Sequence, residues 1–291
     1  MDLRRLGYFL AVAEEGSFTK AARSVHVAQP SLSQAVRELE AELGTELFHR
    51  LGRQVVLTPA GRALLEPARQ AHRDVEVGRQ AVASVAGLGG GILEVCALPT
   101  LAADPLASLV GRFRRTYPQV RVSIAGPDTP MALQDLVRSG VSELGLTVMA
   151  DTFSGLNHYE VQGRQELVAV LPPETELSTR SLSITRLAKL PLVVSAPGTS
   201  SRDLLDDALA EAGLEAEVAV TAAARDAMVP LVLAGAGVAV LPGPVAETAR
   251  RAGATLVRIR PRLTRRLAVV HRPGPLSPSA ARFLELVSLR A

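Results

Sequence analysis

Four short hydrogen-bonding side chains, Gln29, Ser31, Ser33 and Gln34, crowd the first turns of a helix predicted from Pro30 to about Leu43. None of them is charged, and the first carboxylate follows one turn later. Gln can form two hydrogen bonds to adenine, Ser can donate or accept, and an arginine such as Arg37 reaches a base or a phosphate. This pattern indicates a surface that could read base edges in a DNA groove.

Two predicted helices precede this segment and would position it. Apolar spacing over residues 3–15 predicts a first helix that Gly16 ends, and Ser17 can cap a second helix over 18–25. After a tight connection the third helix begins, and its core-facing stripe comprises Leu32, Ala35, Val36, Leu39 and Leu43. The second and third helices form a helix-turn-helix, and residues 47–57 read as a hairpin that makes it winged.

A plainer interpretation explains the same residues. A helix of an ordinary bundle can begin with a polar cap, and helix-turn-helix patterns are weak signals in isolation. Spacing alone therefore leaves both interpretations open.

A long helix is predicted to follow, opened by Thr58 and Pro59 and extending to residue 86. Its small apolar residues recur at alternating steps of four and three, as in the seam of a coiled coil: Leu64, Ala68, Ala71, Val75, Gly78, Val82 and Val85. Pro67 should kink this helix and Gly78 should weaken it. The seam favours pairing between two chains, and packing within one chain is the alternative.

The GLGGG segment, residues 87–91, predicts a hinge because a helix precedes it and a strand follows. From residue 92 onward, short apolar runs alternate with helical patterns, which indicates an α/β fold with mainly parallel strands. We expect a winged helix-turn-helix over 1–58, a linker helix over 59–86, and a two-lobed α/β domain over 92–291. One lobe would span about 92–162 and 268–291, and the other about 163–267.

Residues 3–66 resemble the N-terminal domain of LysR-type transcriptional regulators. The resemblance rests on these motifs: GSF after the first helix, AA in the second, QPSLS entering the third, ELGTELFHR in the wing, and LTPAG opening the linker. The later TYPQVRV, GAGVAVLP and PGTSSR segments resemble the family more loosely. The family implies a regulator without a cofactor that binds double-stranded DNA at a pseudo-palindromic operator and meets RNA polymerase.

The resemblance also assigns roles to residues. Gln29, Pro30, Ser33 and Arg37 become candidates for base reading, with Gln34 beside them. Candidates for phosphate contacts are Ser17, Ser31, Arg50, Arg53 and Thr58. Candidates for the dimer seam are Leu64, Ala68, Ala71, Val75 and Val82. Relatives commonly assemble as dimers or tetramers, and nothing in the heptad pattern distinguishes two chains from four.

Charge balance sets a condition on the DNA-binding interpretation. Residues 1–86 hold 11 basic and 10 acidic side chains, so this segment has almost no net positive charge. For the contact face to be basic, most carboxylates must point away from the phosphates. The ones that decide this are Glu38, Glu40, Glu42 and Glu46.

In the C-terminal domain, the family resemblance implies an effector cleft between two lobes. It places Thr100, Leu101, Thr129, Ser200 and Ser201 at this cleft, on turns that lead from strands into helices. Helix N-termini suit a small anion, and Arg202 could pair with one. Each hydroxyl could equally be a plain helix cap, Arg202 could pair with Asp206, and Asp128 is unfavourable to a bound anion.

The sequence argues against two other classes of protein, an enzyme and a solute-binding module. The five histidines are dispersed without metal-ligand spacing, and no P-loop, GxSxG elbow or dinucleotide fingerprint occurs, which argues against an enzyme. A solute-binding module would need export, and no signal peptide or membrane span is predicted, so a cytoplasmic protein is expected. The single cysteine, Cys96, argues against a two-thiol redox switch.

Overall fold

The computed structural model describes residues 1–51, 54–85, 90–175 and 181–288. The chain forms two compact units, one comprising Met1–Gly90 with Gly274–Pro278 and the other Gly91–Pro273 with Ser279–Ala291. In the described part of the chain, none of the helices combines the length and the hydropathy needed to cross a membrane.

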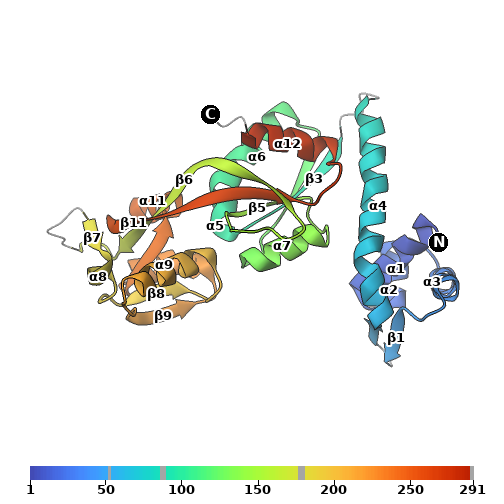
Figure 1. The fold of residues 1–291 in the computed structure, drawn as a ribbon, viewed down its shortest axis with the longest axis horizontal. Coiled ribbons are helices and arrows are strands. Elements are labelled where there is room, and N and C mark those ends of the chain that lie inside the picture. Colours follow the sequence, from blue (N-terminus) through green and yellow to red (C-terminus); the bar gives the residue numbers. More distant parts are fainter. Residues whose placement is uncertain (52–53, 86–89, 176–180, 289–291) are drawn as a thin grey trace. The chain divides into compact units, whose positions relative to one another are not determined.

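The first unit is a winged helix-turn-helix followed by one long helix (Figure 1). Its elements are α1 (Leu3–Glu15), α2 (Phe18–Ser24), α3 (Gln29–Leu43), β1 (Phe48–Leu51), β2 (Gln54–Leu57) and α4 (Pro59–Val85). Gly16 ends α1 in the left-handed conformation, with φ 58°, and the Ser17 side chain caps α2. Gly44 ends α3 with φ 69°. The predicted helix stop at Gly16 and helix cap at Ser17 are confirmed.

Three phenylalanines hold the wing onto the helices. The Phe48 ring of β1 lies 5.3 Å from Phe9 of α1 and 5.8 Å from Phe18 of α2, measured between ring centroids. All three side chains are buried. The tilted and edge-on geometries are those that aromatic pairs favour, so this cluster fixes β1 against α1 and α2.

The first half of α4 packs within its own unit. Ala68 is only 1% exposed, and Leu64 and Ala71 pack against the same hydrophobic core. Ala68 is thus covered within its own unit, whereas Leu64 and Ala71 are only partly buried there. That these three residues pair between chains stays a prediction. Val82, further along α4, is 71% exposed. The second half of the predicted seam is therefore the part more open to a contact between chains.

The second unit contains a mixed sheet, nine-stranded in its described part, with strand order β4-β3-β5-β11-β6-β10-β8-β9 and β7 beside β11. The strands are β3 (Gly91–Ala97), β4 (Val120–Ala125), β5 (Leu144–Val148), β6 (Asn157–Leu171), β7 (Ser181–Ser183), β8 (Leu192–Ser195), β9 (Val218–Ala222), β10 (Val238–Pro242) and β11 (Thr255–His271). The helical elements are α5 (Pro99–Leu101), η1 (Ala102–Leu106), α6 (Ala107–Thr116), α7 (Pro130–Arg138), α8 (Ile184–Leu187), α9 (Ser200–Glu211), η2 (Arg225–Ala227), α10 (Met228–Leu233), α11 (Gly243–Arg251) and α12 (Pro278–Ser288).

Two long strands join the two lobes of this unit. Figure 1 shows β6 and β11 side by side, passing from the lobe of β3, β4 and β5 to the lobe of β8, β9 and β10. They pair antiparallel, whereas β3 with β4 and β8 with β9 are parallel. The β6–β11 register shifts between Arg266 and Leu267, opposite Gly163 with its φ of 92°. Two lobes are confirmed, but the expected mainly parallel sheets are one mixed sheet.

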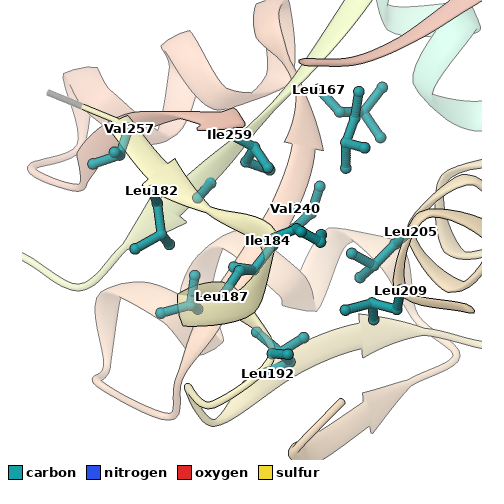
Figure 2. Packing of buried hydrophobic residues seen from close by; sticks show 14 of the residues in the cluster. Leu167, Leu182, Ile184, Leu187, Leu192, Leu205, Leu209, Val240, Val257 and Ile259 are labelled. Carbon is teal, nitrogen blue, oxygen red and sulfur yellow. The ribbon is translucent and has the colours of Figure 1, made fainter. Parts of the chain in front are cut away.

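Helices cover both faces of the sheet in the second lobe. Along β6, Leu167, Ala169 and Leu171 belong to one buried cluster, and Val170 belongs to another on the opposite face. Figure 2 shows the first cluster, in which Leu205 and Leu209 of α9 pack near Val240 of β10. A sheet buried on both faces explains the nearly continuous apolar runs in the sequence.

Two helical segments of the second unit begin or break at prolines. The helical segment between residues 99 and 116 is interrupted, because Asp104 has non-helical backbone angles in front of Pro105. The helix α11 begins within the sequence Pro242-Gly243-Pro244, because proline is well tolerated in the first turn of a helix.

Candidate functional site

The exposed face of α3 carries one stripe of residues at helical spacing. Pro30, Gln34 and Arg37 are exposed, whereas Leu32 and Val36 on the opposite side are fully buried. Among the described residues, Arg37 has no ion-pair partner. Gln29 and Ser31 are also exposed at the first turn. Together these exposed residues present the amides of Gln29 and Gln34, the Ser31 hydroxyl, the Arg37 guanidinium and the apolar ring of Pro30.

Two predicted contact residues are buried. Ser33 is 5% exposed, because it lies on the flank of α3 that turns toward the core. Thr58 is 5% exposed, and its hydroxyl donates to the Glu46 carbonyl at 2.8 Å and accepts from the Gly61 N–H at 2.9 Å. That both residues contact DNA stays a prediction, made on side chains that are buried in this structure. Thr58 caps α4.

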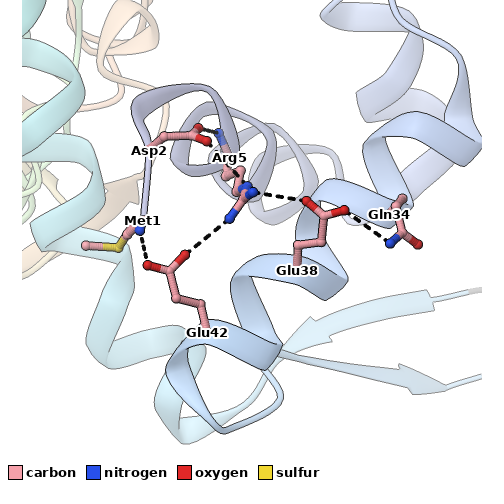
Figure 3. Close-up of polar contacts among 6 residues, drawn as sticks. All are labelled: Met1, Asp2, Arg5, Gln34, Glu38 and Glu42. Carbon is pink, nitrogen blue, oxygen red and sulfur yellow. Dashed lines mark hydrogen bonds and ion pairs between the residues drawn. The ribbon is translucent and has the colours of Figure 1, made fainter.

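Glu38 and Glu42 of α3 bond partners within the chain (Figure 3). Arg5 of α1 bonds Glu38 at 3.1 Å and Glu42 at 3.2 Å, and the Met1 amine also bonds Glu42. The pKa of the Glu42 carboxyl is lowered, chiefly by the hydrogen bond from that amine. Glu40 accepts from the Leu47 N–H at 2.9 Å. Three of the four carboxylates in question are thus compensated within the chain.

Glu38 also orients a member of the stripe. The Gln34 amide nitrogen donates to the Glu38 carboxylate at 3.2 Å, as Figure 3 shows. Because an ionised carboxylate only accepts hydrogen bonds, the Gln34 nitrogen must face it. The Gln34 amide oxygen is then left for an external donor.

The remaining predicted DNA-contact residues lie around the stripe. Ser17 caps α2 by accepting from the Lys20 N–H at 3.4 Å, which is the plain capping role. No side chain caps the start of α3, so its first N–H groups are open to a phosphate. Arg50 lies in β1, with a side chain outside the described set, and Arg53 lies outside the described residues.

In the second unit, a buried arginine gathers three of the predicted effector residues. Arg265 of β11 is 7% exposed. Its guanidinium donates to the hydroxyls of Ser200 at 2.7 Å, Thr100 at 3.0 Å and Ser201 at 3.2 Å. It also donates to the Gln165 amide oxygen at 2.6 and 2.9 Å. We call Arg265, Gln165, Thr100, Ser200 and Ser201 the Arg265 cluster.

The Arg265 cluster contains a positive charge and no negative one. Each group that Arg265 bonds is neutral, so its charge is solvated by dipoles alone. Burial, and repulsion from Arg225, lower the pKa of Arg265 to about 10. The guanidinium remains charged at neutral pH. A buried charge without an opposite charge is costly to a protein, and such sites are often functional.

The other three predicted effector residues have structural roles. Thr129 caps α7, accepting from the Ala132 N–H at 3.1 Å. Leu101 is fully buried in the core. Arg202 forms an ion pair with Asp206 at 2.6 Å, the alternative that its helical spacing indicated. Of the predicted set, the structure brings Thr100, Ser200 and Ser201 together.

Sequence reasoning missed Arg265, Gln165 and Arg225. Arg265 stands among ten basic residues in the last 42 positions, and nothing in its immediate neighbours marks it. Its partners Gln165 and Thr100 are 100 and 165 positions away in the chain. The pairing of β11 with β6 places Arg265 opposite Gln165, and Thr100 reaches Arg265 from α5.

Comparisons with known proteins identify the family. A family model described as the LysR substrate binding domain matches residues 86–290, and one described as a bacterial regulatory helix-turn-helix protein of the lysR family matches residues 3–62. The chain belongs to the LysR family. It is a LysR-type transcriptional regulator that binds DNA and carries a domain for effector sensing.

Curated relatives and solved structures agree over nearly the whole regulator. The DNA-binding transcriptional dual regulator OxyR of Escherichia coli is 28% identical over 98% of this chain and 93% of its own length. The RuBisCO operon transcriptional regulator of Allochromatium vinosum is 29% identical over 99% and 95%. These matched relatives are regulators, not enzymes.

Two solved structures share the fold. A full-length OxyR variant from Pseudomonas aeruginosa has a TM-score of 0.80 at 23% identity, covering 99% of this chain and 93% of that one. CbnR, crystallised with its target DNA, has a TM-score of 0.72 at 26% identity and covers 100% of both chains.

Proposed function

We propose that the exposed stripe of α3 reads the operator. Gln29, Pro30, Gln34 and Arg37 would meet base edges, and Ser31 would contact a phosphate. This proposal rests on the ion pairs and hydrogen bonds that Glu38, Glu40 and Glu42 form with groups within the chain. Because these carboxylates are paired, Arg37 is a cation without an ion-pair partner beside the uncharged members of the stripe. Arg50 and Arg53 would add phosphate contacts from the wing.

Two copies of this DNA-binding unit, which we call the reading head, would act together. Residues 1–58 would form the reading head, 59–86 the linker helix and 92–291 the effector domain. The expected hinge over 87–91 falls largely on residues outside the described part of the chain. Pairing through the second half of α4 would place two heads on one duplex and match a pseudo-palindromic operator in the bacterial cytoplasm. At the operator, the regulator would contact RNA polymerase.

We infer that the effector is a small anion bound beside the Arg265 cluster. Thr100 lies on α5 in one lobe, and Ser200 and Ser201 lie on α9 in the other, so an anion held by these groups would tie the lobes together. An effector acts only through different affinities for two arrangements, a coupling of roughly 1 to 3 kcal/mol. The buried, uncompensated charge of Arg265 supports this inference.

Base reading and phosphate binding should be separable by mutation. Gln29→Ala should reduce discrimination between operator and scrambled DNA by roughly 1 to 3 kcal/mol, because it removes a base contact. Arg53→Ala should weaken binding to all sequences alike and lower the slope of log K against log salt by about one unit. Titration of both DNAs at several salt concentrations measures this. Equal losses on both DNAs for both variants would refute the division of roles.

Anion binding should be visible as a rise in melting temperature. Sodium acetate, compared with sodium chloride at equal ionic strength, should stabilise the effector domain, by about 1.4 kcal/mol at ten times its Kd. Replacing both Thr100 and Ser201 with Val should remove this effect and spare operator binding. Thr116→Val is the matched control, since its exposed hydroxyl bonds Arg112 at the end of α6. Acetate stabilisation that persists in the double variant would exclude these hydroxyls from the site.

We also propose that this regulator does not respond through cysteine oxidation, although several relatives are named hydrogen peroxide-inducible genes activators. Cys96 is the single cysteine, and its side chain is buried in β3. Burial raises the pKa of the Cys96 thiol from 9.0 to about 11. The thiolate is the reactive species, so a raised pKa suppresses oxidation.

Cys96 should accordingly be inert in the folded regulator. At pH 8 its thiolate population should be roughly 100-fold below that of an ordinary thiol, and burial slows reaction further. Iodoacetamide should label it only after unfolding in urea, and hydrogen peroxide should leave operator binding unchanged. Because the folded pKa exceeds the unfolded one, this group stabilises the fold below pH 9 and loses that contribution as pH rises toward 11. Rapid native labelling would contradict the assignment.

A further inference from the structure

A small apolar cavity opens beside the Arg265 cluster in the lobe formed by β8, β9 and β10. Its volume is about 50 Å³, which is room for roughly three to five water-sized groups. Its walls come from β8, β10 and three neighbouring helices, and they are Val193, Leu205, Met228, Val240, Leu241 and Val245. Ser195 of β8 also lines the cavity, and its hydroxyl already bonds the Thr199 hydroxyl at 2.7 Å. The other wall side chains are apolar, so the space suits an apolar group.

The rim of the cavity, in contrast, offers hydrogen-bond donors. Thr100, Ser201, Arg202 and Arg225 line it. The hydroxyl oxygens of Thr100 and Ser201 already accept from Arg265. A hydroxyl has a single hydrogen, and among the described residues neither of these two has an acceptor for it. Both hydrogens are therefore available to an acceptor at the rim.

The charges around the rim favour a single negative charge. Arg202 is compensated by Asp206, and Arg225 lies 3.8 Å from the exposed Asp128 carboxylate. Asp203 bonds the Gly198 N–H, and burial raises its pKa. Arg265 alone has neutral partners only. One carboxylate would balance it, whereas a second would have no cation left to meet.

We infer that this cavity binds a short-chain aliphatic monocarboxylate. This inference rests on the proposed anion site and specifies its ligand. The carboxylate would accept from the Thr100 and Ser201 hydroxyls and from Arg225 at the rim, and the alkyl chain would enter the apolar cavity. The same ligand would contact α5 of one lobe and α9 and α10 of the other, so chain length would affect both affinity and the coupling between the lobes.

A series of unbranched acids tests this inference on the full-length regulator. Acetate, propionate, butyrate, valerate, hexanoate and octanoate would be titrated by calorimetry at one ionic strength. Each methylene that enters the cavity should tighten binding about fourfold, as burial of one CH₂ does. Affinity should reach a maximum near valerate and fall at octanoate, because a volume of about 50 Å³ has room for only a few groups. Butyramide, which lacks the charge, should bind at least tenfold more weakly than butyrate.

A variant that enlarges the cavity provides a second readout. Met228→Ala removes side-chain atoms from the wall and should move the optimum to acids about two carbons longer. Those acids should also raise its melting temperature, because they refill the space. Met131→Ala is the matched control: Met131 lies on α7, is 72% exposed and does not line the cavity, so the optimum should stay unchanged.

The outcomes separate the two proposals. If acetate binds but longer acids bind no more tightly, or if Met228→Ala leaves the optimum in place, the cavity assignment is overturned and the anion site stands. If no acid and no inorganic phosphate binds, both are overturned. If valerate binds as described but operator affinity does not change, the cavity assignment stands and its role as an effector site is overturned.

Discussion

Val75→Arg should abolish high-affinity operator binding by separating the two reading heads. Ala68 is buried inside the first unit and Leu64 and Ala71 are partly buried there, so we expect the second half of the α4 seam to carry most of the contact between chains. A charge on that half would lack a partner in a close helix pair. Linked heads gain a factor of about 10² to 10⁴ in affinity over single ones, and a monomer should lose that gain.

The control for this variant lies two positions away. Val77 is on the opposite side of α4, about 200° around the helix from Val75, so Val77→Arg makes the same chemical change off the seam. It should leave the oligomer and the operator affinity intact. Light scattering after size exclusion, with operator titration, measures both properties. A Val75→Arg variant that stays oligomeric with unchanged affinity would show that the linker helix does not pair through this face.

The local signals in the first unit were sufficient to predict its elements. Gly16 before Ser17, Gly44, and Thr58 before Pro59 each mark a boundary through backbone geometry or a cap that involves only a few neighbouring residues. The burial of Ser33 and Ala68 was not predictable in the same way. A helix pattern gives the angle of a residue on the helix, but other helices decide how far the core extends around it.

The sheet and the Arg265 cluster depend on long-range pairing. The strands β6 and β11 are longer than their apolar segments, because their middle sections carry polar residues where they cross between the lobes. This pairing places Arg265 opposite Gln165, and no periodicity in either segment predicts that contact. A charged residue that distant partners bury has the same neighbours in sequence as one exposed to solvent. The role proposed for Arg265 in anion binding could therefore be inferred only from the structure.

Gly61→Ala should destabilise the reading head by about 3 kcal/mol, at the upper end of the usual cost of overpacking. A Cβ on Gly61 would lie 2.1 Å from the Leu47 carbonyl oxygen, which is backbone and cannot swing aside. That carbonyl also accepts from the Thr58 N–H at 3.0 Å, and the Leu47 side chain is 1% exposed. Relief of the clash would therefore pull α4 away from the strand that begins the wing and disturb a buried side chain.

The matched substitution in the same unit is Gly7→Ala in α1. A Cβ there would have His72 Cε1 at 3.9 Å as its nearest neighbour, an ordinary contact, and alanine in place of glycine favours a helix by roughly 0.5 to 1 kcal/mol. Calorimetry should show the melting transition of the reading head lowered by roughly 10 to 20 °C in Gly61→Ala and unchanged or raised in Gly7→Ala. Operator binding should fall in the first variant only as its head unfolds, so cooling should restore it. Equal melting temperatures would mean that α4 and the wing do not approach as closely as their backbones indicate.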